Sequence, residues 1–482
     1  MLGRHRVLPL LALCWLFTDA LAGVLHVPGD YPTIQAAILN AYYGDTVLVA
    51  PGTYVESINF LSKAITVLSE AGAAETSIQS PGSTPVATFA NGETSSSLLE
   101  GFTLSGGSYQ YGGGVYCSAA SPVIRSCVIT GNTADYGGGL YAQNGSSIVL
   151  EQCAVEGNEA KWGGGVCAWA ASPRLLNCSV SGNTASSPGI GGGIYASEAS
   201  VLTIANSLIS SNSSSSTGGG ICVSVGCDLT VPLNNVIAFN HSATKGGGIG
   251  FAGAAVSEVL QNSILWGNDA PIGPQASLDF SASVSIAYSD VQGGSSGVYV
   301  ASGSSLSWLE GMIDEDPLFE SGSLSDYHLG PGSPCIDSGN PSPDHNDPED
   351  PWNPGYAHWP ALGALRNDMG IYGGGGAGVW TGIPGADEGP DPDGPAILIE
   401  LAGNPVSEAL ELRLGVPVAC QVELSIFDVA GRLVLHPAPF QLPGGESGLR
   451  FGIVELPVGL YMVRLEAAGL QGAGSLRFVR LR

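Results

Sequence analysis

A triplet of consecutive glycines recurs along the middle of the chain every 25 to 28 residues, and this feature constrains the fold most. The triplets begin at Gly112, Gly137, Gly163, Gly191, Gly218 and Gly246. An asparagine closes the apolar run of each unit, at Asn132, Asn158, Asn183, Asn212, Asn240 and Asn268. A unit this short cannot bury its own apolar face, so the period predicts a solenoid of stacked units.

The residues within each unit decide which kind of solenoid forms. The apolar runs read CVITGN, CAVEGN, CSVSGN, SLISSN, NVIAFN and SILWGN, the alternation of short β-strands. Glycine and asparagine tolerate the left-handed backbone angles of tight corners. Leucine-rich repeats need leucines at fixed spacing, and helical repeats would not tolerate a glycine triplet in every unit. The repeat therefore predicts an all-β protein built mainly from a parallel β-helix.

Stacking in register places equivalent residues directly above one another, about 4.8 Å apart. The inward column predicted from this is Cys127, Cys153, Cys178, Ser207, Asn235 and Ser263. We read it as a core column of small residues, and the spacing leaves one disulfide between neighbouring rungs open. The preceding corner column contains Asn177, Asn206, Asn234 and Asn262, which are predicted to bond along the stack. The alignment also predicts exposed ion pairs, Arg125 with Glu151 and Asp135 with Lys161.

The start of the repeat region supplies a cap and a resemblance. YPTIQAAI from Tyr31 predicts a short amphipathic helix that covers the open solenoid end, and GDTVLVAPGTY follows from Gly44. This opening resembles that of pectin-lyase-like β-helix proteins, and the glycine-marked units resemble right-handed β-helix repeats of bacterial surface and secreted proteins. The resemblance covers residues 24–375 and implies a right-handed parallel β-helix. It implies no one activity, because that superfamily includes lyases, hydrolases, esterases, adhesins and non-enzymes.

These patterns divide the chain into six expected parts. They are a signal peptide (1–22), an N-terminal cap with the first coils (23–97), glycine-marked coils (98–300), a closing segment (301–375), a Gly/Pro/Asp-rich linker (376–396) and a small β-sandwich (397–482). IFDVAGRLV and LPVGLYMVRLEA in the last part resemble the C-terminal sorting domains of type IX-secreted bacterial proteins. The tail would then engage secretion machinery; an ordinary adhesive sandwich is the alternative. The protein is expected to be secreted or on the outer cell surface, without a transmembrane segment.

Charge and cysteine usage exclude some partners. The formal net charge of −27 argues against nucleic acid and anionic membrane surfaces. Nine cysteines follow the signal peptide without any CxxC pair, which argues against structural zinc. The glycine triplets are not phosphate loops, since no GxxxxGK follows a strand.

Two groups of residues are candidate binding sites. The residue before each of the first three triplets is aromatic: Tyr111, Tyr136 and Trp162. Stacked on an exposed face, these rings would form a flat platform for a sugar; alternatively, they pack on one another and shield the corner. Calcium is the cofactor suggested by the oxygen ligands Asp344, Asp347, Glu349 and Asp350, although a rigid solvated loop explains them equally.

No catalytic residue can be assigned from these patterns. Charged residues in the coils are sparse, and no column sets two aspartates beside an arginine. The leading interpretation is therefore a non-enzymatic extracellular protein that binds a glycan or another extracellular surface. The alternative is a polysaccharide lyase or glycoside hydrolase whose site lies among Asp337, His345, His358, Trp359, Arg366 and Asp368. A third interpretation is a stalk without a ligand.

Overall fold

The computed structural model describes most of the repeat region and the strands of the tail. The described residues are 22–253, 259–319, 327–330, 332–349, 355–357, 361–376, 398–401, 409–416, 420–428, 433–437, 440–442, 445–453, 456, 459–467 and 473–480. The expected signal peptide and most of the linker lie outside them. The all-β prediction is confirmed: a right-handed parallel β-helix is followed by a small β-sandwich.

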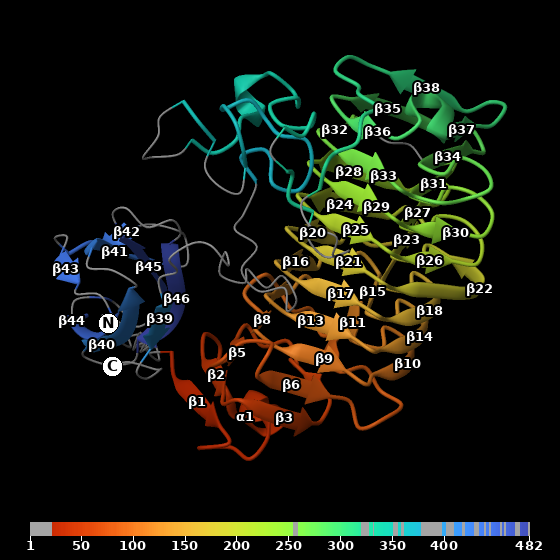
Figure 1. The fold of residues 1–482 in the computed structure, drawn as a ribbon. Coiled ribbons are helices and arrows are strands. Elements are labelled where there is room, and N and C mark those ends of the chain that lie inside the picture. The colour runs from red at the N-terminus through yellow and green to blue at the C-terminus, as the bar shows by residue number, and fades with distance from the viewer. Residues whose placement is uncertain are drawn as a thin grey trace, which may run out of the picture.

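Each coil passes through up to four strands and then begins again one level along the axis. One coil runs through β12 (Val123–Arg125), β13 (Val128–Thr130), β14 (Thr133–Tyr136) and β15 (Leu140–Gln143). Each of these strands pairs in parallel with its counterpart in the next coil. The stacked strands form four sheets, which we call A, B, D and C in the order of these strands. Figure 1 shows the coils stacking from the red N-terminal end to the green end.

Within the described residues, sheet A has twelve strands, sheets B and C ten each, and sheet D six. Besides β12, sheet A contains β1 (Val24–Val27), β2 (Thr46–Val49), β5 (Thr66–Ser69), β8 (Leu98–Glu100), β16 (Val149–Glu151), β20 (Arg174–Leu176), β24 (Val201–Ala205), β28 (Asp228–Leu233), β32 (Leu260–Gln261), β35 (Ser283–Ala287) and β38 (Ser305–Trp308). Besides β13, sheet B contains β3 (Gly52–Val55), β6 (Thr76–Gln79), β9 (Thr103–Ser105), β17 (Ala154–Glu156), β21 (Ser179–Ser181), β25 (Leu208–Ser210), β29 (Val236–Ala238), β33 (Ile264–Trp266) and β36 (Asp290–Val291). Besides β15, sheet C contains β4 (Ile58–Asn59), β7 (Ala87–Phe89), β11 (Val115–Ser118), β19 (Val166–Trp169), β23 (Ile194–Ser197), β27 (Ile221–Val223), β31 (Ile249–Ala252), β34 (Ala276–Asp279) and β37 (Val298–Val300). Besides β14, sheet D contains β10 (Ser108–Tyr111), β18 (Glu159–Trp162), β22 (Thr184–Ile190), β26 (Ser213–Ser214) and β30 (His241–Ser242).

Columns of identical side-chain direction fill the interior. In sheet B the inward column is Ile78, Leu104, Ile129, Val155, Val180, Ile209, Ile237, Leu265 and Val291, in register from coil to coil. All of these side chains are buried. The predicted column of Cys127, Cys153 and Cys178 is confirmed as core, because each is fully buried and remains a free thiol. A single coil cannot shield such a column from water. The side chains therefore become buried only when the coils stack.

A buried asparagine ladder runs along the turn from sheet B to sheet D. It is made by Asn132, Asn158, Asn183, Asn212, Asn240 and Asn268, the residues that close each apolar run. The Nδ2 of each one donates to the Oδ1 of the next at 3.0 Å. The sequence instead predicts a ladder in the column of Asn177, Asn206, Asn234 and Asn262, where the Nδ2 of Asn262 donates to the Oδ1 of Asn234 at the longer distance of 3.4 Å. The buried ladder satisfies corner amides that stacking removes from water.

The glycine triplets form the corner between sheets D and C, where successive coils touch through their backbones. The first glycine of the second triplet, Gly137, has a φ of +64°. The next, Gly138, has no room for a side chain, because a Cβ there would lie 2.5 Å from the carbonyl oxygen of Gly164. A Cβ on Gly139 would lie 2.7 Å from the oxygen of Gly165. Only glycine lets the coils approach closely enough for their strands to pair.

The N-terminal end of the solenoid is covered as predicted. Helix α1 (Ile34–Asn40) buries Ile34, Ala37 and Ile38 against the first coils. The side chain of Thr33 accepts from the backbone N–H of Ala36 and caps the start of the helix. At its other end the Nζ of Lys63 donates to the carbonyls of Ile38, Leu39 and Ala41 at 2.6 to 2.8 Å. The ammonium group thus neutralises the negative end of the helix dipole.

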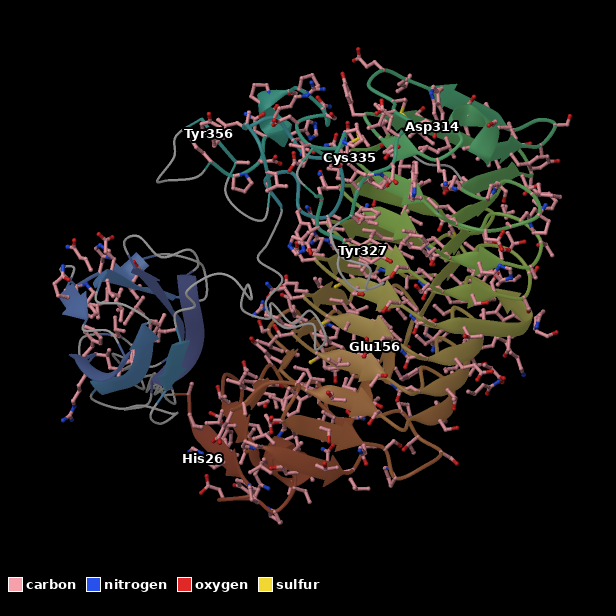
Figure 2. The ribbon with its side chains drawn as sticks, in the orientation of Figure 1. His26, Glu156, Asp314, Tyr327, Cys335 and Tyr356 are labelled. Atoms are coloured by element: carbon pink, nitrogen blue, oxygen red, sulfur yellow. The ribbon has the colours of Figure 1, made fainter. Side chains whose placement is uncertain are left out.

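The closing segment does more than extend the last coil. Residues 305–308 still form β38 of sheet A, but described residues between 327 and 372 pack on the outer face of sheet B. There Tyr327, Cys335, Met369 and Ile371 pack against outward side chains of β25, β29 and β33. Figure 2 shows Tyr327 and Cys335 beside these coils. The segment therefore covers an apolar strip that stacking alone would leave in water.

The corner column predicted from the sequence holds this segment in place. Asn206, Asn234 and Asn262 all have positive φ and direct their side chains toward the closing segment. Asn206 donates to the Gly373 carbonyl at 2.7 Å, and Asn234 donates to the Asp368 carbonyl at 2.9 Å. The Oδ1 of Asn262 accepts from the N–H of Asn340 at 2.8 Å. These asparagines therefore bind the closing segment more than they bond to one another from coil to coil.

Replacing Asn234 with glycine should loosen the closing segment while leaving the solenoid intact. Glycine keeps the left-handed backbone conformation but removes the amide that bonds to Asp368, at a cost of about 1–3 kcal/mol. Limited proteolysis between residues 327 and 376 should become about tenfold faster. Asn144→Gly is the control, because Asn144 has a similar φ of +56° and bonds only across the surface to Ser118. Equal proteolysis of both variants would contradict the docking role.

Two antiparallel sheets make up the described part of the tail. One contains β39 (Leu398–Leu401), β40 (Ala409–Val416) and β44 (Gly445–Gly452). The other contains β41 (Cys420–Asp428), β42 (Leu433–Leu435), β43 (Phe440–Leu442), β45 (Gly459–Ala467) and β46 (Ala473–Arg480). Alternate residues are buried, such as Leu410 and Leu412 in β40 and Val422, Leu424 and Ile426 in β41. This is the period-two pattern expected of a small sandwich.

Candidate functional site

The three aromatic residues predicted from the sequence come together at the corner between sheets D and C. Tyr111, Tyr136 and Trp162 each end a strand of sheet D, and they occupy one register position in successive coils. The Tyr111 and Tyr136 ring centroids are 5.5 Å apart, and those of Tyr136 and Trp162 are 4.5 Å apart. The glycine triplets that follow place each ring directly over the previous one. We call this group, together with Tyr116, Tyr141, Trp169 and Tyr195 of sheet C, the aromatic wall.

The rings of the wall are stacked on one another. The interplanar angles are 23° for Tyr111 on Tyr136 and 12° for Tyr136 on Trp162. Ile190 occupies the next register position after Trp162 and packs against the same cluster. Stacking uses the ring faces, so the half-buried column presents mainly ring edges along its side. The rings therefore pack on one another, which is the alternative to a flat platform that the sequence left open.

Sheet C contributes a second row that sequence reasoning missed. Tyr116, Tyr141 and Tyr195 lie outward in this sheet, and Tyr141 contacts both Tyr111 and Tyr136 at 5.2 and 6.0 Å between centroids. The recurring signal was the second residue after each triplet, which is tyrosine in three coils and cysteine in two others, Cys167 and Cys222. Burial raises the pKa of Tyr141, so its phenol stays neutral and acts as a hydrogen-bond donor.

Trp169 differs in orientation from the other rings. Its plane stands at 87° to that of Tyr136, with 5.8 Å between centroids. Polar groups border the wall: Gln143 donates to the Tyr116 hydroxyl at 2.6 Å, and Asn144 donates to Ser118 at 3.0 Å. The arrangement combines partly exposed aromatic rings with amides and hydroxyls, which is the chemistry of a site for a polar, ring-shaped ligand.

The structure describes three of the four predicted calcium ligands, Asp344, Asp347 and Glu349. Asp347 is buried, and its carboxylate accepts from the N–H groups of Asp368 and Gly374. Glu349 accepts from the N–H of Gly355 at 2.9 Å, and Asp344 is exposed on a short turn (Pro343–His345). Asp350 lies outside the described residues. Among the described residues no three His, Cys, Asp or Glu side chains converge as a metal site. Calcium binding by this segment stays a prediction.

The residues of the enzymatic alternative mostly support the closing segment. The carboxylate of Asp368 accepts from the N–H groups of Asp337 and Leu362 at 2.8 and 2.7 Å. The Arg366 guanidinium donates to the carbonyl of Gly339 at 2.9 Å. The backbone carbonyl of His345 accepts from the Asn367 side chain. His358 and Trp359 lie outside the described residues. Burial raises the pKa of Asp368 to about 7, and burial with the charge of Asp368 raises the pKa of Asp347 to about 8.

The predicted ion pairs form on the outer faces of the coils. The Lys161 Nζ lies 2.6 Å from the Asp135 carboxylate. Arg125 lies 2.8 Å from Glu151 and 3.5 Å from Glu100 of the preceding coil, a second acid that the sequence alignment overlooked. Glu100 is buried, so Arg125 with its two acids connects three successive coils instead of leaving a free carboxylate.

A buried acid joins the closing segment to the last coils and should make stability depend on pH. Asp290 is fully buried, and the Cys335 thiol donates to it at 3.4 Å. Burial raises the pKa of Asp290 from 3.8 to about 7. The folded chain therefore holds a proton that the unfolded chain releases above about pH 4.

Stability should consequently fall as the pH rises from about 4 through 7, by on the order of 2 kcal/mol from this residue. Asp290→Asn keeps a carbonyl acceptor for Cys335 and removes the titration, so its unfolding midpoint should fall less over this range. Thermal unfolding of both proteins across the pH series measures the difference. Identical pH profiles would show that folding leaves the pKa of Asp290 unshifted.

Residues 92–305 match the family model of the right handed beta helix region. This match spans the glycine-marked coils and agrees with the parallel sheets A to D. It defines the class as a right-handed parallel β-helix. No curated protein matches the chain. Among the described residues no helix is both long and apolar enough to cross a membrane.

Proposed function

We propose that this chain is an exported, non-enzymatic β-helix protein that binds an uncharged glycan at the aromatic wall. The observation that carries the proposal is the in-register stack of Tyr111, Tyr136 and Trp162, joined by Trp169 and bordered by polar side chains. Aromatic rings offer apolar surface to the CH faces of sugars, while amides and hydroxyls bond to sugar hydroxyls.

The charge of the chain supports an uncharged ligand. At a net charge of −27 the protein repels polyanions, which include uronic-acid and sulfated polysaccharides as well as nucleic acid. At the wall, the nearest charged pair, Asp135 and Lys161, is self-neutralising. Neutral glycans therefore suit this chain better than pectate does.

The disposition of acidic groups supports binding more than catalysis. General acid–base chemistry needs carboxylates that face the substrate. Asp337, Asp347 and Asp368 instead accept hydrogen bonds from backbone N–H groups of the closing segment. The location of the protein is inferred from its first 22 residues and from the tail, whose sorting-like motifs would address it to a secretion machinery or anchor it at the outer surface.

Replacing Tyr136 with leucine should weaken glycan binding about tenfold or more, because this ring contacts Tyr111, Trp162 and Trp169 and holds the wall together. The measurement is a glycan array followed by calorimetric titration of the full chain, with calcium and with chelator. Phe280→Leu is the matched control, since Phe280 is 73% exposed and lies away from the wall.

Three outcomes would contradict the proposal. Equal binding by both variants would place the ligand elsewhere. Release of sugar products that a chelator abolishes would replace the binding protein with a metal-dependent lyase, the enzymatic alternative. An absence of binding to any glycan would favour a stalk.

A further inference from the structure

The chain contains two Asn-Gly pairs, and both lie at the corner where a coil passes from sheet C to sheet A. Asn91 and Gly92 come after β7, and Asn144 and Gly145 come after β15, two coils further along the solenoid. All four residues are exposed. The two corners therefore place the same dipeptide in two local structures that can be compared.

An Asn-Gly pair can react in water without an enzyme. The backbone nitrogen of the glycine attacks the side-chain amide carbon of the asparagine, ammonia leaves with the proton of that nitrogen, and a five-membered cyclic imide forms. Water then opens the imide at either carbonyl and leaves aspartate or isoaspartate. Glycine favours the ring closure because it has no side chain to hinder the attack. The reaction requires a glycine nitrogen that is free to move and to lose its proton.

The two glycines differ in one respect, the partner of their N–H group. Their φ angles are similar, +77° for Gly92 and +73° for Gly145, and an added Cβ would meet nothing within 4 Å at either position. The N–H of Gly145 donates to the carbonyl of Ala170 in the next coil at 2.7 Å. The N–H of Gly92 makes no hydrogen bond within the part of the chain that the structure describes.

That single bond protects Asn144. The nitrogen of Gly145 is fixed in the stack of coils, so attack on the Asn144 amide must first break a contact between coils. Asn91 is held differently: its Nδ2 donates to the Oδ1 of Asn59 at 3.1 Å at the surface, and its own N–H donates to Glu93 at 2.9 Å. Neither of these bonds holds the attacking nitrogen of the following glycine.

We infer that Asn91 is a site of spontaneous deamidation in the folded chain, with water as the only co-reactant, and that Asn144 is protected from the same reaction. The inference is independent of the proposed glycan. It assigns a slow and irreversible covalent change to the first coils of the solenoid, and this change converts a neutral amide into a carboxylate.

The product alters the contacts of a buried acid. Glu93 is 2% exposed, and its carboxylate accepts from the N–H groups of Ser62 and Asn91, each at 2.9 Å. A carboxylate at position 91 adds a second negative charge near this group and cannot donate to Asn59. Isoaspartate also lengthens the backbone by one carbon just before Gly92. Deamidation therefore loosens the corner between the first coils.

Incubation of the full chain in mildly alkaline buffer, followed by peptide mapping with mass spectrometry, tests the assignment. Asn91 should convert at least about tenfold faster than Asn144, because a backbone hydrogen bond must open before Asn144 reacts. In the chain unfolded by guanidinium the two pairs should convert at similar rates, since folding is what separates them. Equal rates in the folded chain, or no conversion of Asn91 while the unfolded chain converts, would overturn the inference.

Asn91→Gln is the matched variant, because it keeps an exposed amide whose longer side chain would have to close a six-membered ring. On ion exchange this variant should keep its charge through the incubation, whereas the unmodified chain gains a negative charge. The aged unmodified chain should also unfold at a lower temperature than the aged variant. A charge gained equally by the variant would place the reaction elsewhere, and equal unfolding midpoints would overturn the loosening at Glu93.

Discussion

Replacing Gly138 with alanine is expected to destabilise the solenoid by about 3 kcal/mol or more. This is one of the two largest effects that we predict for a single substitution. The added Cβ would lie 2.5 Å from the oxygen of Gly164 and 2.6 Å from that of Glu159. Both oxygens are backbone atoms of the next coil and cannot rotate away. The coils must separate at this corner, which breaks the strand pairing on either side of it.

The control for this prediction is Gly145→Ala, which separates steric from conformational cost. Gly145 has a φ of +73°, but nothing lies within 4 Å of an added Cβ. Alanine there should cost only about 1 kcal/mol, the ordinary penalty for a left-handed residue. Thermal unfolding followed by circular dichroism should rank the unmodified chain first, Gly145→Ala second and Gly138→Ala last. A Gly138→Ala midpoint equal to that of the control would show that the corner relaxes.

In-register stacking explains why much of the solenoid could be predicted from the sequence. The triplets define the length of each coil, and residues at the same position in successive coils are neighbours in space. Aligning the repeats with one another therefore predicts which residues are in contact. Arg125 with Glu151, Asp135 with Lys161 and the column of Cys127, Cys153 and Cys178 were all found in this way, and the structure confirms them. The helix at residues 34–40 followed from its apolar spacing and from the need to cover an open end.

The closing segment could not be placed by the same reasoning. Its contacts join residues more than a hundred positions apart, such as Asn234 with Asn367, and these contacts obey no period. The corner asparagines looked equivalent to one another in the sequence, and only the packing of Met369 and Ile371 on sheet B explains why several of them face a docked segment. The long-range part of the fold thus depends on complementarity between surfaces that no local pattern encodes.

The sequence predicted which residues come together at the candidate site but not how their rings are oriented. Tyr111, Tyr136 and Trp162 lie together because their register is that of the coils. The direction of a ring, however, depends on side-chain torsions and on neighbours in another sheet, such as Tyr141 and Trp169. A column of aromatic letters is compatible with a flat platform or with a stack, and the two bind ligands differently.

Replacing Asn183 with alanine is expected to destabilise the chain by about 4 kcal/mol. The substitution removes buried hydrogen bonds to the asparagines of both neighbouring coils. Asn183 is fully buried. Its Oδ1 accepts from the backbone N–H and the side chain of Asn158, and its Nδ2 donates to the carbonyl of Val155 and to Asn212. Alanine removes these four bonds within the core, although the Asn158 amide keeps its bond to the Ile129 carbonyl and the Asn212 Oδ1 keeps the backbone N–H of residue 183.

Asn144→Ala is the matched control for the ladder, since it removes an exposed amide that bonds only to Ser118 at the surface. It should cost about 1 kcal/mol, most of it from the positive φ of this residue. Comparable midpoints for the two variants would mean that the coils are held by strand pairing alone. A much lower midpoint for Asn183→Ala would instead show that the ladder sets the register: each asparagine bonds to the next coil only when the coils align, so a slipped coil loses the same four bonds as the variant does.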